Sequence, residues 1–178
     1  MKILNQIALL LLLSSILAYA EAPGKWERWK PFLGEWQGLG SGEPGQGNGE
    51  FTFEPALQGV VLTRHSYAQY PATKDKPAYR HDDLMVIYSD PGPKIQAEYW
   101  DNEGHVIGYD VDVLDGKLVF TSDAADPGPR YRLTYVKTSE DTLKMSFEIA
   151  APTNRESFKT YIEGSARRKT TGQAHSSP

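Results

Sequence analysis

The chain has 178 residues, a formal net charge of -4 and no cysteine. The missing cysteines exclude disulfides, a thiol nucleophile and a thiolate metal site. The acidic balance, without a stripe of lysine and arginine, argues against a nucleic-acid partner. This length fits one domain with a single core.

The first twenty residues have the pattern of a secretory signal peptide. Lys2 precedes an apolar run from Ile7 to Leu13, and Ala18-Tyr19-Ala20 forms a small-x-small cleavage site. Polar residues interrupt the apolar stretch, so we expect cleavage after Ala20 and no stable membrane anchor afterwards. The sequence therefore predicts a secreted or periplasmic protein.

The segment KWERWKPFL, residues 25–33, has the only helical periodicity. Trp26, Trp29 and Leu33 share a face over barely two turns around Pro31. It predicts a short N-terminal helix that acts as a lid or plug.

After this segment the chain alternates apolar and polar residues with period two. LKMSFEIA, for example, places Leu143, Met145, Phe147 and Ile149 on one side, and in GEFTFEPAL Phe51 and Phe53 do the same. Such alternation is typical of strands with one wet and one dry face, and turn residues separate the segments. We predict about ten strands, at 34–41, 47–57, 59–70, 81–89, 94–101, 105–114, 117–123, 130–137, 142–150 and 158–169.

Short strands joined by tight hairpins, without crossover helices, predict an antiparallel meander. Closure removes the exposed edges, so we predict an all-β fold, an antiparallel up-and-down closed barrel, over residues 21–169. Residues 170–178 are polar and aperiodic and are predicted to be a disordered tail.

The stretch FLGEWQGLGSG, residues 32–42, is rich in glycine. A nucleotide-binding loop would need a helix after it, but more glycines and a strand follow. The interpretation we favour is a first strand that bends sharply, with Trp36 plugging one end of the barrel.

The Gly-x-Trp of this stretch, combined with Arg167, Arg168 and Lys169 near the end of the chain, resembles the calycin superfamily of lipocalin-like barrels. The resemblance implies that an arginine of the closing strand packs over Trp36. FLGEWQGLGSG also resembles nitrobindin-type haem-binding barrels. VIYSDPGPKIQAEYWDNEGHVIGYDV is similar to a family of bacterial lipocalin-like proteins of uncharacterised function.

The nitrobindin resemblance would place a haem-ligating histidine near Tyr161 or Glu163, but FKTYIEGSARRK contains no histidine. Tyrosine can ligate ferric haem, so Tyr161 is the one chemical alternative. We expect no cofactor.

Two clusters carry residues suited to chemistry. EYWDNEGH supplies Glu98, Asp101 and His105, which could form an acid/base site at the barrel mouth, although the same residues suit a hairpin turn. His81 and Asp83 share a strand face and would need a third metal ligand, such as His65, His105 or a distant carboxylate. We favour the turn and a solvated strand end, with no catalytic residue and no metal.

Tyrosines are frequent on the predicted strands, which suits an interior lined by rings. The sequence favours a protein that binds a small hydrophobic or amphipathic molecule inside the barrel, as a monomer or homodimer. The alternatives are the enzyme above and an envelope interaction protein with a solid barrel. The expected pocket residues, assigned from strand parity, are Arg64, Tyr99, Trp100, Tyr109, Tyr131 and Tyr135.

Overall fold

The computed structural model describes residues 24–40, 47–89, 92, 94–123 and 128–170. The predicted signal peptide, residues 1–20, lies outside the described residues. So does the predicted tail apart from Thr170.

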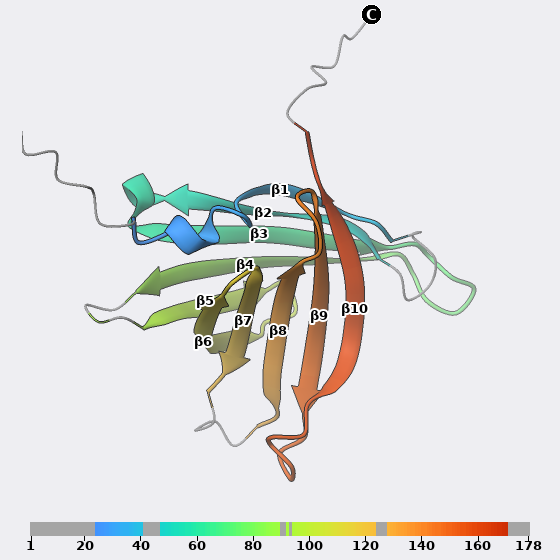
Figure 1. The fold of residues 1–178 in the computed structure, drawn as a ribbon. Helices are drawn as coiled ribbons and strands as arrows, with labels where there is room; N and C mark the ends of the chain where they lie inside the picture. The colour runs from blue at the N-terminus through green and yellow to red at the C-terminus, as the bar shows by residue number, and fades with distance from the viewer. Residues whose placement is uncertain (1–23, 41–46, 90–91, 93, 124–127, 171–178) are drawn as a thin grey trace, which may run out of the picture.

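The described residues form ten antiparallel strands that close into a barrel (Figure 1). Each strand pairs with its neighbour in sequence, and the first pairs with the last. The predicted all-β, up-and-down closed barrel is confirmed. The strands are β1 (Gly34–Gly38), β2 (Asn48–Ala56), β3 (Val61–Tyr70), β4 (Tyr79–Ser89), β5 (Ile95–Asp101), β6 (Val106–Leu114), β7 (Lys117–Ser122), β8 (Arg130–Lys137), β9 (Thr142–Ala150) and β10 (Lys159–Arg168).

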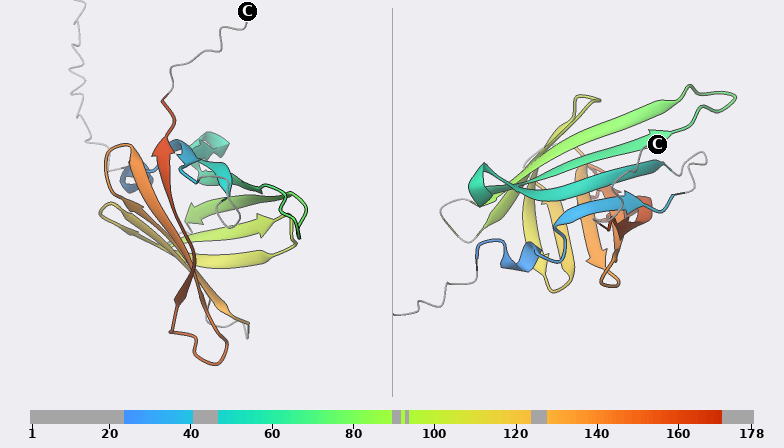
Figure 2. Two further views of the ribbon diagram at one scale, coloured as in Figure 1. Left: turned by 90° about the vertical axis from the view of Figure 1, so that its right-hand side faces the viewer. Right: turned by 90° about the horizontal axis from the view of Figure 1, so that it is seen from above.

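The strands fall into two groups that cross at a steep angle. In Figure 1, β2 to β4 run across the view while β8 to β10 run down it, and the two views of Figure 2 show the same crossing. Strong twist and coiling of the strands let ten of them close without a free edge.

The N-terminal segment is a three-residue 3₁₀ helix, η1 (Glu27–Trp29), shorter than the two turns that the sequence predicts. Pro31 has no backbone N–H, so it cannot donate the hydrogen bond that would extend the helix past Lys30. A second short 3₁₀ helix, η2 (Leu57–Gly59), connects β2 to β3. Neither described helix has the length or the apolar character that crossing a bilayer requires.

Trp29 of η1 plugs one end of the barrel, which we call the closed end. Its ring is fully buried, with its centroid 6.0 Å from that of Phe53 and 6.1 Å from that of Phe120. Phe53 and Phe120 both contact Tyr135, so aromatic rings fill this half of the interior. The lid or plug predicted for this segment is therefore present.

Closure between β1 and β10 places Arg168 opposite Trp36. The guanidinium carbon lies 4.2 Å from the centre of the fully buried indole ring. Arg168 also donates hydrogen bonds to the carbonyl oxygens of Leu33 and Pro31. The predicted arginine over the first-strand tryptophan is thus observed, and it fastens the N-terminal segment to the last strand.

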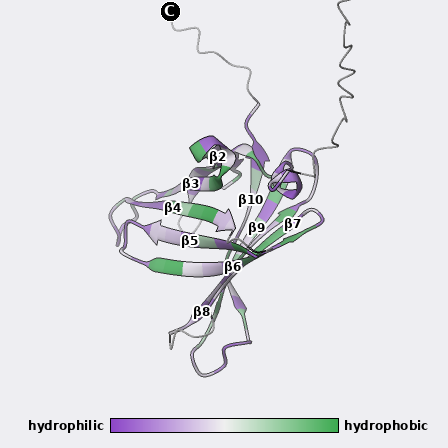
Figure 3. Ribbon diagram, turned by 90° about the vertical axis from the view of Figure 1, so that its left-hand side faces the viewer, coloured by the Kyte–Doolittle hydropathy of each residue, from purple (hydrophilic) through white to green (hydrophobic). Residues whose placement is uncertain are grey.

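Burial alternates along β6 and β7 as period two requires, and Figure 3 shows hydrophobic and hydrophilic residues mixed along the strands in view, such as β4 and β6. Phe51 and Phe53 face inward and are nearly or fully buried. Met145 and Phe147 pack against the same core but remain partly exposed. The inward stripe predicted for these four residues is confirmed, and Met145 and Phe147 are more exposed than Phe51 and Phe53.

Candidate functional site

The half of the barrel opposite Trp29, which we call the mouth, is open to solvent. Five inward-facing hydrophobic side chains pack against the core and are nevertheless only partly buried. Water therefore reaches the inner wall of the barrel at this end. These side chains are Tyr99, Ile107, Tyr131, Met145 and Phe147.

Gly164 on β10 marks unfilled space on this inner wall. It has the same parity as the buried Ala166 and lies opposite Met145 on β9. A Cβ atom built on Gly164 meets no atom within 4 Å. The interior beside Met145 thus has room for added atoms.

Arg64 and Asp83 form an ion pair at the floor of the mouth. Their side chains are 8% and 5% exposed. Burial alone would lower the pKa of Arg64, but the Asp83 carboxylate, together with Tyr135 and Tyr99, outweighs burial and raises that pKa. Arg64 is therefore a permanent buried cation, held by a carboxylate from the neighbouring strand.

Two buried polar atoms beside this pair have no hydrogen-bonding partner of regular geometry among the described residues. They are Nε of Arg64 and the hydroxyl oxygen of Tyr135, which lies close enough to the Arg64 guanidinium to interact with it. Burial raises the pKa of Tyr135 to about 12, and the charge of Arg64 opposes that effect. Because buried polar groups are nearly always hydrogen-bonded, these two atoms are suited to a polar atom of a ligand.

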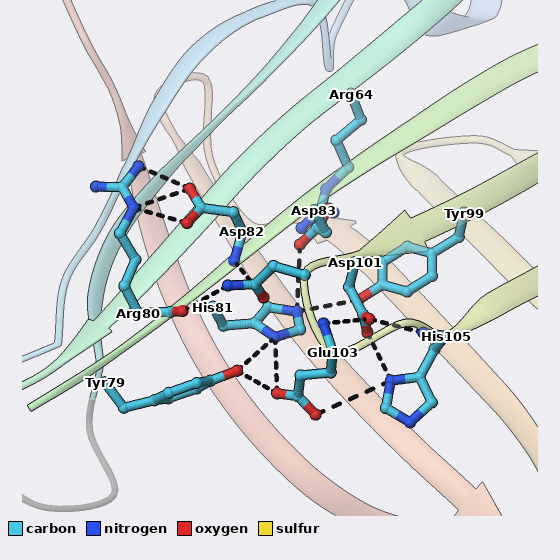
Figure 4. A network of polar contacts seen from close by, with 11 residues as sticks. Arg64, Tyr79, Arg80, His81, Asp82, Asp83, Tyr99, Asp101, Glu103 and His105 are labelled. Carbon is cyan, nitrogen blue, oxygen red and sulfur yellow. Dashed lines mark hydrogen bonds and ion pairs between the residues drawn. The ribbon is translucent and has the colours of Figure 1, made fainter. Parts of the chain in front are cut away.

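A polar network leads from this floor to the rim (Figure 4). The ring nitrogens of His81 lie 3.0 Å from the hydroxyl oxygen of Tyr99 and 3.2 Å from Oε1 of Glu103. Tyr99 donates to Oδ2 of Asp101 at 3.1 Å, and Tyr79 donates to Glu103. Burial, together with Asp83 and Asp101, raises the pKa of Tyr99, so this hydroxyl stays protonated.

Asp101 also shapes the turn between β5 and β6. Its Oδ1 accepts hydrogen bonds from the backbone N–H groups of Glu103 and His105, both at 2.9 Å, and its Oδ2 lies 2.8 Å from Nδ1 of His105. Burial would raise the pKa of Asp101, but these hydrogen bonds lower it overall. Gly104, with φ of 92°, completes the turn. The predicted hairpin turn is therefore present.

Most residues expected to line the pocket come together inside the barrel. Arg64, Tyr109 and Tyr135 are buried, and the Tyr99 and Tyr109 rings lie in contact with centroids 6.5 Å apart. Tyr131 stacks on Phe147 with centroids 5.9 Å apart. The sequence of the predicted strand 59–70 allows either set of alternate residues to face inward. The structure places Arg64 on the inner face. Their role in binding a ligand remains a prediction.

Trp100 is the exception. Its side chain lies on the outer face of the barrel, 36% exposed, opposite Leu84 and Val106 on the neighbouring strands. The inward orientation predicted for it is wrong, because adjacent residues of a strand point to opposite faces and Tyr99 takes the inner one.

The acid/base set expected at the mouth assembles only in part. Asp101 and His105 lie together, but Glu98 is exposed on the outer face, beside the inward-facing Ala97. Asp101 and His105 are already used by the turn, which leaves them few free hydrogen-bonding positions.

The metal hypothesis rests on His81 and Asp83. Their side chains do lie on the same face of β4, and Nε2 of His81 is 3.7 Å from Oδ2 of Asp83. His65 is exposed on the opposite face. The described residues contain no group of three or more histidine, aspartate or glutamate side chains placed to hold a metal ion. Tyr161, the alternative haem ligand, is 69% exposed and touches Phe147 at the mouth.

Sequence reasoning did not include Asp83, Met145, Phe147 and Gly164 in the pocket. The alternation along strand 142–150 predicted that Met145 and Phe147 face the interior, but it did not predict that they lie in the open half of the barrel. The depth of Asp83 depends on the register of β4 against β3 and β5. Strand parity from a single sequence carries no information about that register.

No protein-family model matches this chain, and neither does any curated protein sequence. The functional argument therefore rests on the geometry of the barrel.

Proposed function

We propose that this protein is an exported, lipocalin-like barrel that binds a small hydrophobic or amphipathic molecule in its mouth. The observation that carries the proposal is the unfilled inner wall: Gly164 has open space around it, and the nearby Met145 and Phe147 stay partly exposed. An apolar cavity lined by rings, with a few polar groups, is the common design of small-molecule sites.

The polar groups at the floor favour an amphipathic ligand. The unpartnered Nε–H of Arg64 would donate to an oxygen of the ligand, and the Tyr135 hydroxyl could join it. The apolar part of the ligand would then lie against Tyr131 and Phe147. Asp83 already balances the charge of Arg64, which favours a neutral oxygen over a fully charged head group.

The location is part of the same proposal. The leader predicted for residues 1–20 supports export to the periplasm or the medium, and Arg168 stacked on Trp36 supports membership of the lipocalin-like barrels. Intact mass measurement of the protein from an expressing bacterial host tests the leader, because cleavage after Ala20 leaves Glu21 as the first residue.

A blocking variant tests binding in the mouth. Gly164→Phe fills the open space from inside, while Gly108→Phe adds the same ring on the outer face, where a Cβ also meets nothing within 4 Å. We expect Nile red, a neutral fluorescent probe with an apolar ring system and a carbonyl oxygen, to bind wild type and Gly108→Phe at one saturable site and Gly164→Phe at none. Native mass spectrometry of purified protein should show a bound small molecule on the same two proteins. Equal probe binding by all three would contradict the proposal.

An enzyme remains the second candidate, favoured by the 2.8 Å contact between His105 and Asp101 at the rim. A carboxylate beside an imidazole can serve in acid/base catalysis. Substitution of His105 by alanine separates the candidates: a carrier keeps its ligand uptake nearly unchanged, whereas an enzyme loses turnover of that ligand.

A further inference from the structure

A groove lies across β2 to β5, with most of its lining residues on the outer face of the barrel. Its volume is about 540 Å³, within the range of small-molecule sites. Most of its lining residues have the opposite strand parity to Arg64 and Tyr99, which point into the barrel. The lining also includes four residues of inward parity, Phe51, Ser66, Asp83 and Asp101. Its outward-facing residues are Glu50, Thr52, His65, Tyr67, Arg80, Asp82, Leu84 and Trp100.

Two aromatic surfaces border this outer groove. The registers place His65, Leu84 and Trp100 side by side on β3, β4 and β5. Tyr67 lies one pair further along β3, with the guanidinium carbon of Arg80 4.1 Å from its ring centre. The apolar side chain of Leu84 thus lies between the indole of Trp100 and the imidazole of His65, with the Tyr67 ring one pair further along.

The charged side chains of the groove are paired with one another or with a neighbour. Nε of Arg80 donates to both carboxylate oxygens of Asp82, at 2.8 and 2.9 Å. Glu50 accepts a hydrogen bond from Nζ of Lys169 at 3.1 Å. A charged ligand would have to compete with these pairs, so the groove favours a neutral one.

The hydrogen-bonding groups that remain free belong to the rings. Within the part of the chain that the structure describes, the hydroxyl of Tyr67, the imidazole of His65 and the indole N–H of Trp100 make no hydrogen bond. They offer both donors and acceptors at the edge of apolar surfaces. Closely spaced hydroxyl groups on a ligand with an apolar face match this pattern.

We propose that the outer groove binds a neutral saccharide. The C–H face of a pyranose ring packs on the indole of Trp100 by dispersion and apolar contact. Its hydroxyl groups exchange hydrogen bonds with His65 and Tyr67, and with the carboxylate lone pairs that Arg80 leaves free on Asp82. The proposal does not depend on the ligand proposed for the mouth, because the ring that it uses, Trp100, lies on the outer face.

Titration of the folded protein with maltotriose, cellotriose and chitotriose tests the proposal, with saturation-transfer NMR and tryptophan fluorescence as readouts. We expect at least one of these neutral trisaccharides to bind with a Kd of about 1 mM or tighter. Trp100→Ala should weaken that binding about tenfold. Trp29 and Trp36 are fully buried and Trp26, in the chain's first segment, is partly exposed, so only a fluorescence change that is lost in Trp100→Ala reports on the groove.

Two controls make the result specific. Tyr161→Ala removes another exposed ring, at the mouth, and should leave the saccharide affinity unchanged. Gly164→Phe blocks the mouth and should do likewise, so failure of the mouth proposal leaves this test intact. The proposal is overturned if none of the three trisaccharides binds at about 10 mM, or if Trp100→Ala, shown to be folded by circular dichroism, binds as tightly as wild type.

Discussion

The guanidinium of Arg64 and the carboxylate of Asp83 form an ion pair inside the barrel, although Arg64 lies directly opposite Met85 in the strand register. The pair is therefore diagonal between β3 and β4. Both side chains are nearly excluded from solvent, so neither charge can be removed alone without leaving the other buried and unpaired.

Arg64→Met should lower the free energy of unfolding by about 3–5 kcal/mol, because it leaves the Asp83 carboxylate uncompensated. The double variant Arg64→Met/Asp83→Leu should recover most of that loss, since both charges are then absent. Urea unfolding of the two single variants and the double variant measures this coupling. A double variant as unstable as Arg64→Met would show that the ion pair is not the cause.

Trp36→Ala should lower the free energy of unfolding by about 3–5 kcal/mol, because it opens a cavity at the closed end and removes the surface on which Arg168 stacks. Trp100→Ala is the matched control on the outer face and should cost less than about 1 kcal/mol. Thermal and urea unfolding compare the two. Similar losses of unfolding free energy in the two variants would mean that Trp36 does not stabilise the contact between β1 and β10.

Gly49→Ala should destabilise the barrel by about 1–3 kcal/mol or prevent folding. A Cβ there would lie 2.0 Å from the backbone oxygen of Tyr67, which cannot move without shifting β3. Gly108→Ala, in open space on β6, should change stability by less than about 1 kcal/mol. The unfolding midpoints of the two alanine variants provide the comparison, and an unaffected Gly49→Ala would contradict the close approach of β2 to β3.

Asp101→Asn should lose stability in a pH-dependent way. The folded-state pKa of Asp101 is lowered, so its charged form contributes stability above the unfolded-state pKa of about 4 and loses it as pH falls through the lower folded-state value. Asparagine keeps the shape but not the charge, and at pH 7 the loss of charged hydrogen bonds should cost about 1–3 kcal/mol. Unfolding curves of wild type and variant between neutral and acidic pH should converge at the acidic end. A gap that stays constant would contradict the assignment.

Local sequence was sufficient for the strands and for closure. The predicted segments 142–150 and 130–137 coincide with β9 and β8, because period-two alternation and turn residues act within a few positions of the chain. The pairing of Trp36 with Arg168 also matched expectation, since a closed meander must bring its first and last strands together.

The sequence by itself therefore determined the strands and their closure into a barrel without exposed edges. The alternation of apolar and polar residues and the turn residues are local properties of the chain. Only the tertiary structure decided which of Tyr99 and Trp100 faces inward, which half of the interior is filled and how Arg64 finds Asp83. These depend on register, twist and the volumes of side chains from strands far apart in sequence, which no local pattern encodes.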